Sequence, residues 1–408
     1  MNTFLTPNWF TTDVAMNWLN SIKFVGRVTR EYNKQWKDSP DGAKIGATVN
    51  VRIPQKWVVN EGQALVMQAI LNQSVPVSIT TQLQIGCEWS SSESALEVEQ
   101  VQERYTKTAA RSLANRSDVF AAEQVYKSVY YSVGAPGQPI TTNDTWLDAV
   151  ALMRNVGVPE DLVACLDPKA MAKLLAGNQA LFNPAAFISE LYKAGKFSGP
   201  ALGMDEWVYD PNMPTFTTGS FTSSTPAVAG ASQTGSSLAI DGLGTYAFVV
   251  GDVFTLDGVY AVNPLSFINT GELQQFVVTA AVSGSSTATL SISPSIITSG
   301  ALQTVTASPA NDAAVSFLGS TGTVSATMTA TNSRQSLVFN PEAFAWVSAD
   351  LPVNLPGAVA GRTSDDQAKL SMRYVESYNI NSDQLPRRMD MLIGAAPILP
   401  YMAFRAWS

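Results

Sequence analysis

Residues 94–131 read SALEVEQVQERYTKTAARSLANRSDVFAAEQVYKSVYY, and this stretch decides how the rest of the chain is interpreted. It contains no Pro or Gly, and good helix formers dominate it. Ser94 followed by Glu97 matches a capping box, and Gly134 and Pro136 follow as stop signals. We therefore predict one helix of roughly 50 Å, about three times the usual length in globular proteins.

One face of this predicted helix carries apolar or small residues. They recur at three- and four-residue spacing: Val98, Val101, Tyr105, Thr108, Ala109 and Ser112. A helix of this length suits a coiled coil, a repeat or the strut of a larger fold. Because the stripe is too irregular for heptads, we favour a strut that lies across a sheet.

The composition indicates extensive contacts with other protein chains. The 408 residues are enough for two or three domains, and 14% of them are charged, against a usual value of about 25%. Charged residues are depleted at the centres of permanent interfaces. A soluble protein with a surface rich in Ser and Thr is the alternative, and we favour the oligomer.

Several functional classes lack the residues that they need. The chain has no histidine, which excludes Ser-His-Asp and Cys-His catalysis and zinc sites that use imidazole. It has no phosphate-binding P-loop and no dinucleotide-binding GxGxxG motif. Carboxylate-pair catalysis needs only Asp and Glu, but no pair stands out. We expect no enzymatic activity, no cofactor and no metal.

Charge, cysteine content and hydropathy indicate the environment of the protein. The net charge of −8 disfavours general nucleic-acid binding. Cys87 and Cys165 are the only thiols, which fits a reducing compartment better than a disulfide framework. Residues 1–13 lack the pattern of a signal peptide, and no apolar run reaches 18 residues, so we expect no membrane span.

Residues 1–37 are a predicted N-terminal arm. Phe10, Val14, Trp18 and Ile22 share one face of a short helix that Thr11 or Thr12 can cap. Basic residues then recur at three- and four-residue spacing: Lys23, Arg27, Arg30, Lys34 and Lys37. If this segment is helical, they form either a solvated face or a contact for an acidic partner or enclosed nucleic acid. Its alternating pattern also allows an extended segment.

Two alternating stretches, 44–54 and 75–85, predict strands that flank a long hairpin loop. Asn60-Glu61-Gly62 offers a tight turn between them. Apolar residues flank the turn: Trp57, Val58, Val59, Leu65, Val66 and Met67. Such a hairpin has little core of its own, so we expect it to lie on another surface.

The second half of the chain changes composition twice. Residues 142–222 read as a compact α+β unit, with helices near Thr145 and Pro168 and a third over 187–192. From Phe197 through Ser333 there is no Lys or Arg, and short alternating runs are punctuated by Gly and Pro. We predict an inserted all-β module of about six strands, a barrel or sandwich, rather than a disordered low-complexity segment.

These features together resemble the major capsid proteins of tailed bacteriophages. Arm, extended hairpin, long helix, compact unit and C-terminal strands occur in that order, and the inserted module narrows the resemblance to short-tailed-phage coat proteins of the Salmonella-phage type. The residues that carry it are Leu5-Thr6-Pro7, the G-x-T-V-x-V-R-x-P run from Gly46 to Pro54, the G-D-V-F-T-x-x-G-V-Y-A-V-N-P run from Gly251 to Pro264, and Leu273-Gln274-Gln275-Phe276.

The resemblance implies the α+β fold of tailed-phage major capsid proteins with an inserted all-β barrel. The implied parts are the N-terminal arm (1–37), the extended loop at about 52–78 with its flanking peripheral-domain strands (38–93), the spine helix of the peripheral domain (94–141), the axial domain (142–222 and 334–364), the inserted β-barrel (223–333) and the C-terminal strands of the peripheral domain (365–408).

The same resemblance implies a structural subunit of an icosahedral capsid. Such subunits form pentamers and hexamers, assemble into a procapsid with scaffolding and portal proteins in the host bacterial cytoplasm, and enclose packaged double-stranded DNA in the virion, in some cases with decoration proteins. The alternative is a non-catalytic surface or adhesin protein with a β-sandwich ligand-binding module, against which the missing signal peptide counts.

Two sets of contact residues follow from the resemblance. The extended loop is expected to touch a neighbouring subunit through Lys56, Trp57, Val58, Leu65 and Met67. The arm is expected to touch scaffolding protein or the capsid interior through Asp13, Trp18, Lys23, Arg27 and Arg30.

Overall fold

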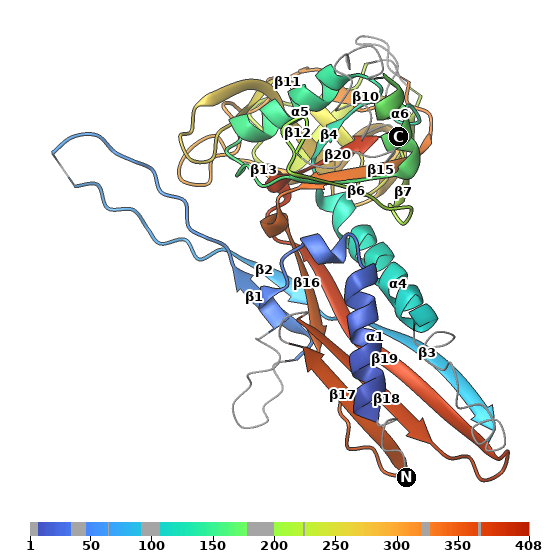
Figure 1. The fold of residues 1–408 in the computed structure, drawn as a ribbon. Coiled ribbons are helices and arrows are strands. Elements are labelled where there is room, and N and C mark those ends of the chain that lie inside the picture. The colour runs from blue at the N-terminus through green and yellow to red at the C-terminus, as the bar shows by residue number, and fades with distance from the viewer. Residues whose placement is uncertain are drawn as a thin grey trace, which may run out of the picture. The chain divides into compact units, whose positions relative to one another are not determined.

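The computed structural model describes most of the chain, in the ranges 7–33, 46–63, 65–90, 107–177, 200–222, 225–319, 327–365 and 369–407. The fold is mixed α+β, and sheets dominate it (Figure 1). The chain forms two compact units, each assembled from separate segments. The first holds Met1–Arg52, Ser74–Gln124 and Phe344–Ile398, and the second holds Ile53–Gln73, Val125–Ala343 and Leu399–Ser408.

Within the described residues, the first unit is built on a five-stranded antiparallel sheet in which β19 pairs with β16, β18 and β3, and β18 pairs with β17. A separate ladder joins β1 to β2. The elements are α1 (Pro7–Ser21), η1 (Val25–Arg27), η2 (Glu31–Asn33), β1 (Thr48–Arg52), β2 (Ser74–Ser78), β3 (Thr81–Ser90), α4 (Lys107–Val125), β16 (Phe344–Ala349), β17 (Ala358–Asp365), β18 (Leu370–Ser377) and β19 (Gln384–Pro397).

Helices α1 and α4 lie on this sheet (Figure 1). Helix α1 contacts β17 and β18. On α4, the hydroxyl of Ser117 donates to Sδ of Met391 on β19 at 3.6 Å. Met389, Met391 and Ile393 alternate along β19 and are buried, as expected for the covered face of a strand. The described part of the predicted strut, Lys107–Val125, thus lies on a sheet.

Residues 7–33, within the predicted N-terminal arm, pack on their own unit. Val14, Trp18 and Ile22 are buried, and the Trp18 ring lies 5.6 Å from that of Trp346 on β16. The carboxylate of Asp118 on α4 accepts the backbone N–H groups of Lys23 and Val25 at 2.9 and 2.8 Å. The predicted apolar face of the helix thus packs on its own unit and needs no neighbouring chain.

Helix α4 differs from its predicted bounds and face. The capping box at Ser94 and the first half of the predicted stripe lie outside the described residues. The predicted Thr108 and Ser112 are exposed, and the buried face consists instead of Ala110, Leu113, Ala114, Ser117, Phe120 and Ala121. The helix ends at Val125 rather than Tyr131, because the aromatic and β-branched residues that follow enter a short 3-10 turn and then a strand.

Across the described part of the second unit, a six-stranded sheet has the order β4-β20-β15-β5-β6, with β7 also paired to β15. Its elements are η5 (Tyr126–Ser128), β4 (Tyr131–Val133), α5 (Asn143–Asn155), β5 (Val163–Leu166), α6 (Pro168–Gly177), β6 (Glu206–Tyr209), β7 (Thr215–Thr217), β15 (Asn332–Phe339), η6 (Pro341–Ala343), η7 (Pro400–Met402) and β20 (Ala403–Trp407). The predicted helices at Thr145 and Pro168 are confirmed, whereas 187–192 lies outside the described residues.

The cation-free segment forms a second sheet in this unit, seven-stranded over the residues described there, with the path β14-β11-β12-β13-β10-β8 and β9 paired to β10. Its strands are β8 (Ser220–Phe221), β9 (Ala227–Val228), β10 (Gly235–Phe248), β11 (Val253–Val262), β12 (Asn269–Val278), β13 (Val282–Ile296) and β14 (Val315–Phe317). Its core is its own and aromatic: the rings of Phe248 and Phe317 stack at 4.5 Å. The cation-free segment is thus a folded β module and not a disordered low-complexity segment.

The two units divide the C-terminal third of the chain differently from the predicted boundaries. Strands β16 and β17 were expected in the axial part, yet they lie in the five-stranded sheet of the first unit. Strand β20 was expected with the peripheral strands, yet it pairs with β15 in the second unit. Within 389–407, Pro397, Pro400 and η7 separate β19 from β20.

The buried Trp18 provides a test of how the N-terminal segment packs. Replacing Trp18 by Ala should lower the free energy of unfolding by roughly 3–5 kcal/mol, because a large buried ring is lost. Met16 lies on the same helix but is exposed, so Met16→Ala should change stability little. Urea unfolding of the isolated subunit measures both. Equal, small effects would show that residues 7–33 do not pack on their own unit.

Candidate assembly surfaces

The loop between β1 and β2 is long and hydrogen-bonded mainly by side chains. Its ends are joined by the N–H of Ile53, which donates to the carbonyl of Gln73 at 2.9 Å. Further out, the amide of Gln55 donates to the Ala69 carbonyl at 3.1 Å, and the amide of Gln68 bonds to both backbone groups of Val58. Side-chain amides thus replace a regular β ladder over the described residues of 53–73.

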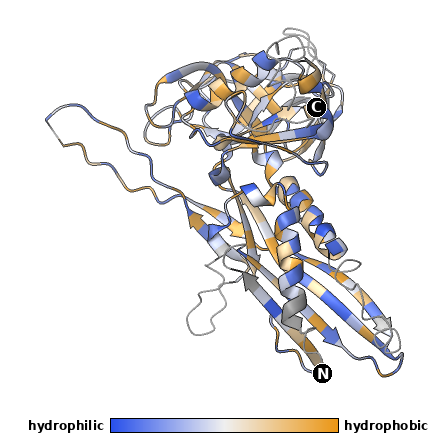
Figure 2. Ribbon diagram, viewed as in Figure 1, coloured by the Kyte–Doolittle hydropathy of each residue, from blue (hydrophilic) through white to orange (hydrophobic). Residues whose placement is uncertain are grey.

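Large apolar side chains on this loop are exposed to solvent. Leu65 is 85% exposed, Met67 83%, Ile70 71% and Trp57 54%. Figure 2 shows these apolar stretches on the excursion that leaves β1 and returns to β2. Exposed apolar residues gathered on one segment mark an interaction surface. Of the five predicted loop contacts, Trp57, Leu65 and Met67 are therefore free to meet a neighbour, and Val58 is half-buried.

The predicted contact residue Lys56 has a partner within its own chain. Its ammonium lies 5.2 Å from the ring centroid of Tyr401, within range of a cation–π interaction. Tyr401 belongs to η7, whose backbone is bonded to 340–343 through Leu399 and Met402. Burial lowers the pKa of Lys56, and burial together with nearby Glu342 raises the pKa of Tyr401. Lys56 thus holds the base of the loop to a fixed element.

The predicted arm contacts differ in accessibility. Trp18 is fully buried and its indole N–H faces Ser117, so its ring is not available to a scaffolding protein in this conformation. Asp13, Lys23, Arg27 and Arg30 are all partly exposed. The Arg27 guanidinium donates to the Lys23 carbonyl at 3.0 Å, and burial lowers the pKa of Arg30. Lys34 and Lys37 lie outside the described residues.

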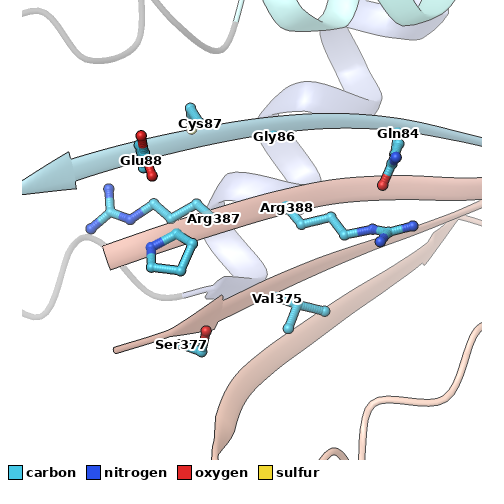
Figure 3. Close-up of a pocket in the computed structure, with 9 residues that line it drawn as sticks. Gln84, Gly86, Cys87, Glu88, Val375, Ser377, Arg387 and Arg388 are labelled. Atoms are coloured by element: carbon cyan, nitrogen blue, oxygen red, sulfur yellow. The ribbon is translucent and has the colours of Figure 1, made fainter. Parts of the chain in front are cut away.

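A groove of about 620 Å³ runs over β3, β18 and β19 (Figure 3). Arg387 and Arg388 leave β19 in different directions (Figure 3), and in the ladder with β3 they lie opposite Cys87 and Gly86. Arg387 pairs with Glu376 at 3.1 Å, and Arg388 pairs with Asp390 at 2.9 Å. Burial raises the pKa of the Cys87 thiol, so this cysteine is no activated nucleophile.

The two sheets of the second unit are joined around the fully buried Arg405 on β20. Its Nη2 donates to the carbonyl of Gly251 at 2.7 Å, in the turn between β10 and β11. The guanidinium carbon lies 5.7 Å from the ring centroids of both Phe216 and Trp407. Burial lowers the pKa of Arg405 to about 10, so the side chain is still charged at neutral pH.

Asp252 lies next to this arginine contact and closes the same turn. Its carboxylate accepts the N–H groups of Gly219 and Val249 at 2.9 and 2.8 Å. A Cβ added to Gly219 would lie 2.4 Å from that carboxylate, so the close approach requires glycine. Burial raises the pKa of Asp252 to about 6, against the lowering effect of these two hydrogen bonds and of Arg405.

Gln275 and Asn263 form two more bonds of this junction. The Ser132 N–H donates to Oε1 of Gln275 at 2.7 Å, and Nε2 of Gln275 donates to the Ser132 carbonyl at 3.1 Å. One side chain thus makes both bonds that a strand next to β4 would make. Nδ2 of Asn263 donates to the Asn155 carbonyl at 2.7 Å, at the end of α5.

Sequence reasoning did not assign roles to these junction residues. Gly251, Asp252 and Asn263 lie in the G-D-V-F run, and Gln275 lies in Leu273–Phe276, so the quoted motifs did contain the signal. Arg405 lies inside an apolar C-terminal strand, and no sequence motif indicated its role.

Among the residues that the structure describes, no cluster of three or more His, Cys, Asp or Glu side chains could hold a metal ion. No described helix is both long and apolar enough to cross a membrane.

The contact of Lys56 with Tyr401 predicts a graded series of variants. Lys56→Met and Tyr401→Leu should each speed amide hydrogen exchange in 53–73 several-fold, because the loop base loses its attachment. Lys56→Arg and Tyr401→Phe retain a cation and a ring, and should exchange as the wild type does. If Tyr401→Phe behaves like Tyr401→Leu, the contact depends on the hydroxyl and not on the ring.

Asp252 predicts a pH dependence of stability with a defined sign. Folding raises the pKa of Asp252 from 3.8 to about 6. Between pH 4 and pH 6, the carboxyl group of Asp252 is therefore protonated in the folded chain and ionised in the unfolded chain. The free energy of unfolding should therefore fall by roughly 2 kcal/mol as pH rises from 4 to 6. Asp252→Asn should abolish this slope in urea titrations, and the exposed control Asp312→Asn should keep it. An unchanged slope in Asp252→Asn would contradict the assignment.

Comparison with known proteins identifies the family. Residues 59–404 match the family model described as P22 coat protein, gene protein 5. None of the curated proteins compared matches the chain. A solved structure of Mycobacterium phage Che8 is 14% identical at a TM-score of 0.45, covering 94% of this chain and 90% of that chain. The virus-like particle from Pyrococcus furiosus is 7% identical at a TM-score of 0.40, covering 97% of both.

A further similarity covers a smaller part of this chain. The CUS-3 coat protein I-domain is 28% identical, with a TM-score of 0.20, over 24% of this chain and 97% of that chain. The assignment itself rests on the family model, which spans most of the sequence. The chain therefore belongs to the P22 coat protein family.

Proposed function

We propose that the chain is the major capsid subunit of a tailed bacteriophage, a structural protein of an icosahedral shell and not an enzyme. Membership of the coat protein family supports this function directly. The observation that carries the physical argument is the exposed apolar surface of the loop 53–73. Exposed apolar residues gathered on one segment mark an interaction surface, and copies of the chain would cover this surface in pentamers and hexamers.

We further propose the short-tailed Salmonella-phage type, in which residues 223–333 are an inserted β-barrel. Hydrogen bonds between β9 and the start of β14 support closure of the sheet: Val228 donates to the Ala313 carbonyl and Val315 to that of Pro226, both at 3.0 Å. The separate aromatic core supports an insertion that folds as a module. The bonds of Arg405 and Gln275 would then fix the barrel to the axial sheet.

We propose the remaining partners from the exposed residues of the arm and from the expected assembly route. Partly exposed Asp13, Lys23, Arg27 and Arg30 are candidate contacts for scaffolding protein or for the capsid interior, where DNA is held by enclosure. Portal and decoration proteins complete the proposed virion, which assembles in the host bacterial cytoplasm. The family assignment gives no support to the alternative of a surface or adhesin protein.

Matched substitutions in the loop test the assembly function. Leu65→Ser, Met67→Ser and Ile70→Ser together should leave the subunit folded and abolish closed shells, because the apolar contacts between copies are lost. The control replaces exposed polar residues of the same loop, Asn60→Ser, Gln63→Ser and Asn72→Ser, and should still assemble. Circular dichroism monitors folding, and electron microscopy with sedimentation monitors shells. Intact shells from the first variant would contradict the role of the loop.

A further inference from the structure

Two buried polar side chains share one face of the six-stranded sheet in the second unit. In the β15–β20 ladder, Gln335 lies opposite Trp407 and Leu337 lies opposite Arg405. Opposite residues of an antiparallel pair point to the same face, as do alternate residues of one strand. Gln335 and Arg405 are therefore diagonal neighbours, with backbones roughly 7–8 Å apart. Both side chains are fully buried.

Arg405 has two donors that the described residues do not satisfy. The rings of Phe216 and Trp407 contact the guanidinium, and Gly251 accepts from Nη2. Within the described ranges, neither Nε nor Nη1 has a hydrogen-bond acceptor. Both groups are buried in the interior between the sheet and the Gly251 turn. Buried donors of a charged group are costly to leave unpaired, so an acceptor is expected there.

Gln335 has a buried acceptor that lacks a donor among the described residues. Its Nε2 donates to the Ser333 hydroxyl and to the Arg334 carbonyl, both at 3.3 Å. Its Oε1 is buried, and no donor among the described residues reaches it. One face of the sheet thus holds unpaired donors and an unpaired acceptor one diagonal step apart. A direct bond does not join them, so the ligand must both accept and donate.

We propose that Arg405 and Gln335 together form a binding site for a buried water molecule. The water accepts a hydrogen bond from Nε or Nη1 of Arg405 and donates one to Oε1 of Gln335, which gives it the partners that buried waters have. An anion such as chloride accepts but cannot donate, so it leaves Oε1 unpaired. Asp252, buried at the same junction, already interacts with the charge of Arg405, so no further anion is required.

The proposed water has a structural role at the insertion. It connects β15 to β20 at the residue whose Nη2 holds the Gly251 turn. The bond to Gly251 depends on the orientation of the guanidinium, and the water fixes that orientation from the opposite edge. The site is complete within one chain, so it does not depend on the proposed assembly.

A structure of the full-length protein at a resolution that shows ordered water tests the site directly. We expect one peak within hydrogen-bond distance of Gln335 Oε1 and of Nε or Nη1 of Arg405, unchanged when chloride is exchanged for bromide. A peak that bromide replaces would identify an anion and overturn the proposal. A Gln335 side chain bonded directly to Arg405 or to another protein donor would overturn it as well.

A double-mutant cycle tests the coupling in solution. Gln335→Leu should raise the unfolding constant roughly 10- to 100-fold, because Arg405 loses its bridging acceptor. In the Arg405→Met background the same change should have a much smaller effect, because both unpaired groups are then gone. Leu337→Met, on the same face but apolar, should act equally in both backgrounds. Equal effects of Gln335→Leu in both backgrounds would contradict a shared water. If Arg405→Met does not fold, the presence or absence of the water peak in the wild-type structure decides between the two outcomes.

Discussion

The subunit depends on one constraint: apolar side chains of the loop 53–73 have no cover within the described part of their own unit. The loop lacks a regular ladder, and Gln55 and Gln68 hold its strands together through side-chain amides. Its base is held by Lys56 against Tyr401, while Leu65, Met67 and Ile70 face solvent. In the proposed shell, the free energy gained by covering these side chains would favour association between subunits, and many such weak contacts would act together.

Each of the two units is held together by packing and hydrogen bonds of its own. In the first unit, Trp18, Phe24 and Met391 pack between the helices and the five-stranded sheet. In the second unit, Arg405 and Gln275 fix one sheet to the other through specific hydrogen bonds. The N-terminal segment 7–33 buries Val14, Trp18 and Ile22 within its own unit, in contrast to the exposed apolar residues of the loop.

Much of this architecture could be predicted from residue patterns. Alternation found β1, and capping and periodicity found α5 and α6, because these elements obey local rules. The apolar loop was also predicted, since Trp57, Leu65 and Met67 have no complementary core nearby in sequence. The end of α4 was misplaced because Tyr130 and Tyr131 tolerate a helix, and only pairing with β20 makes the latter a strand. Arg405 could not be predicted, since its partners are distant in sequence.

Hydrogen–deuterium exchange of 53–73, compared between isolated subunits and assembled shells, tests the central claim most directly. The account predicts fast exchange at Leu65–Ile70 in the free subunit and strong protection in shells, with β19 protected equally in both. Equal exchange of the loop in both states would contradict it, because the apolar segment would then not be covered by assembly.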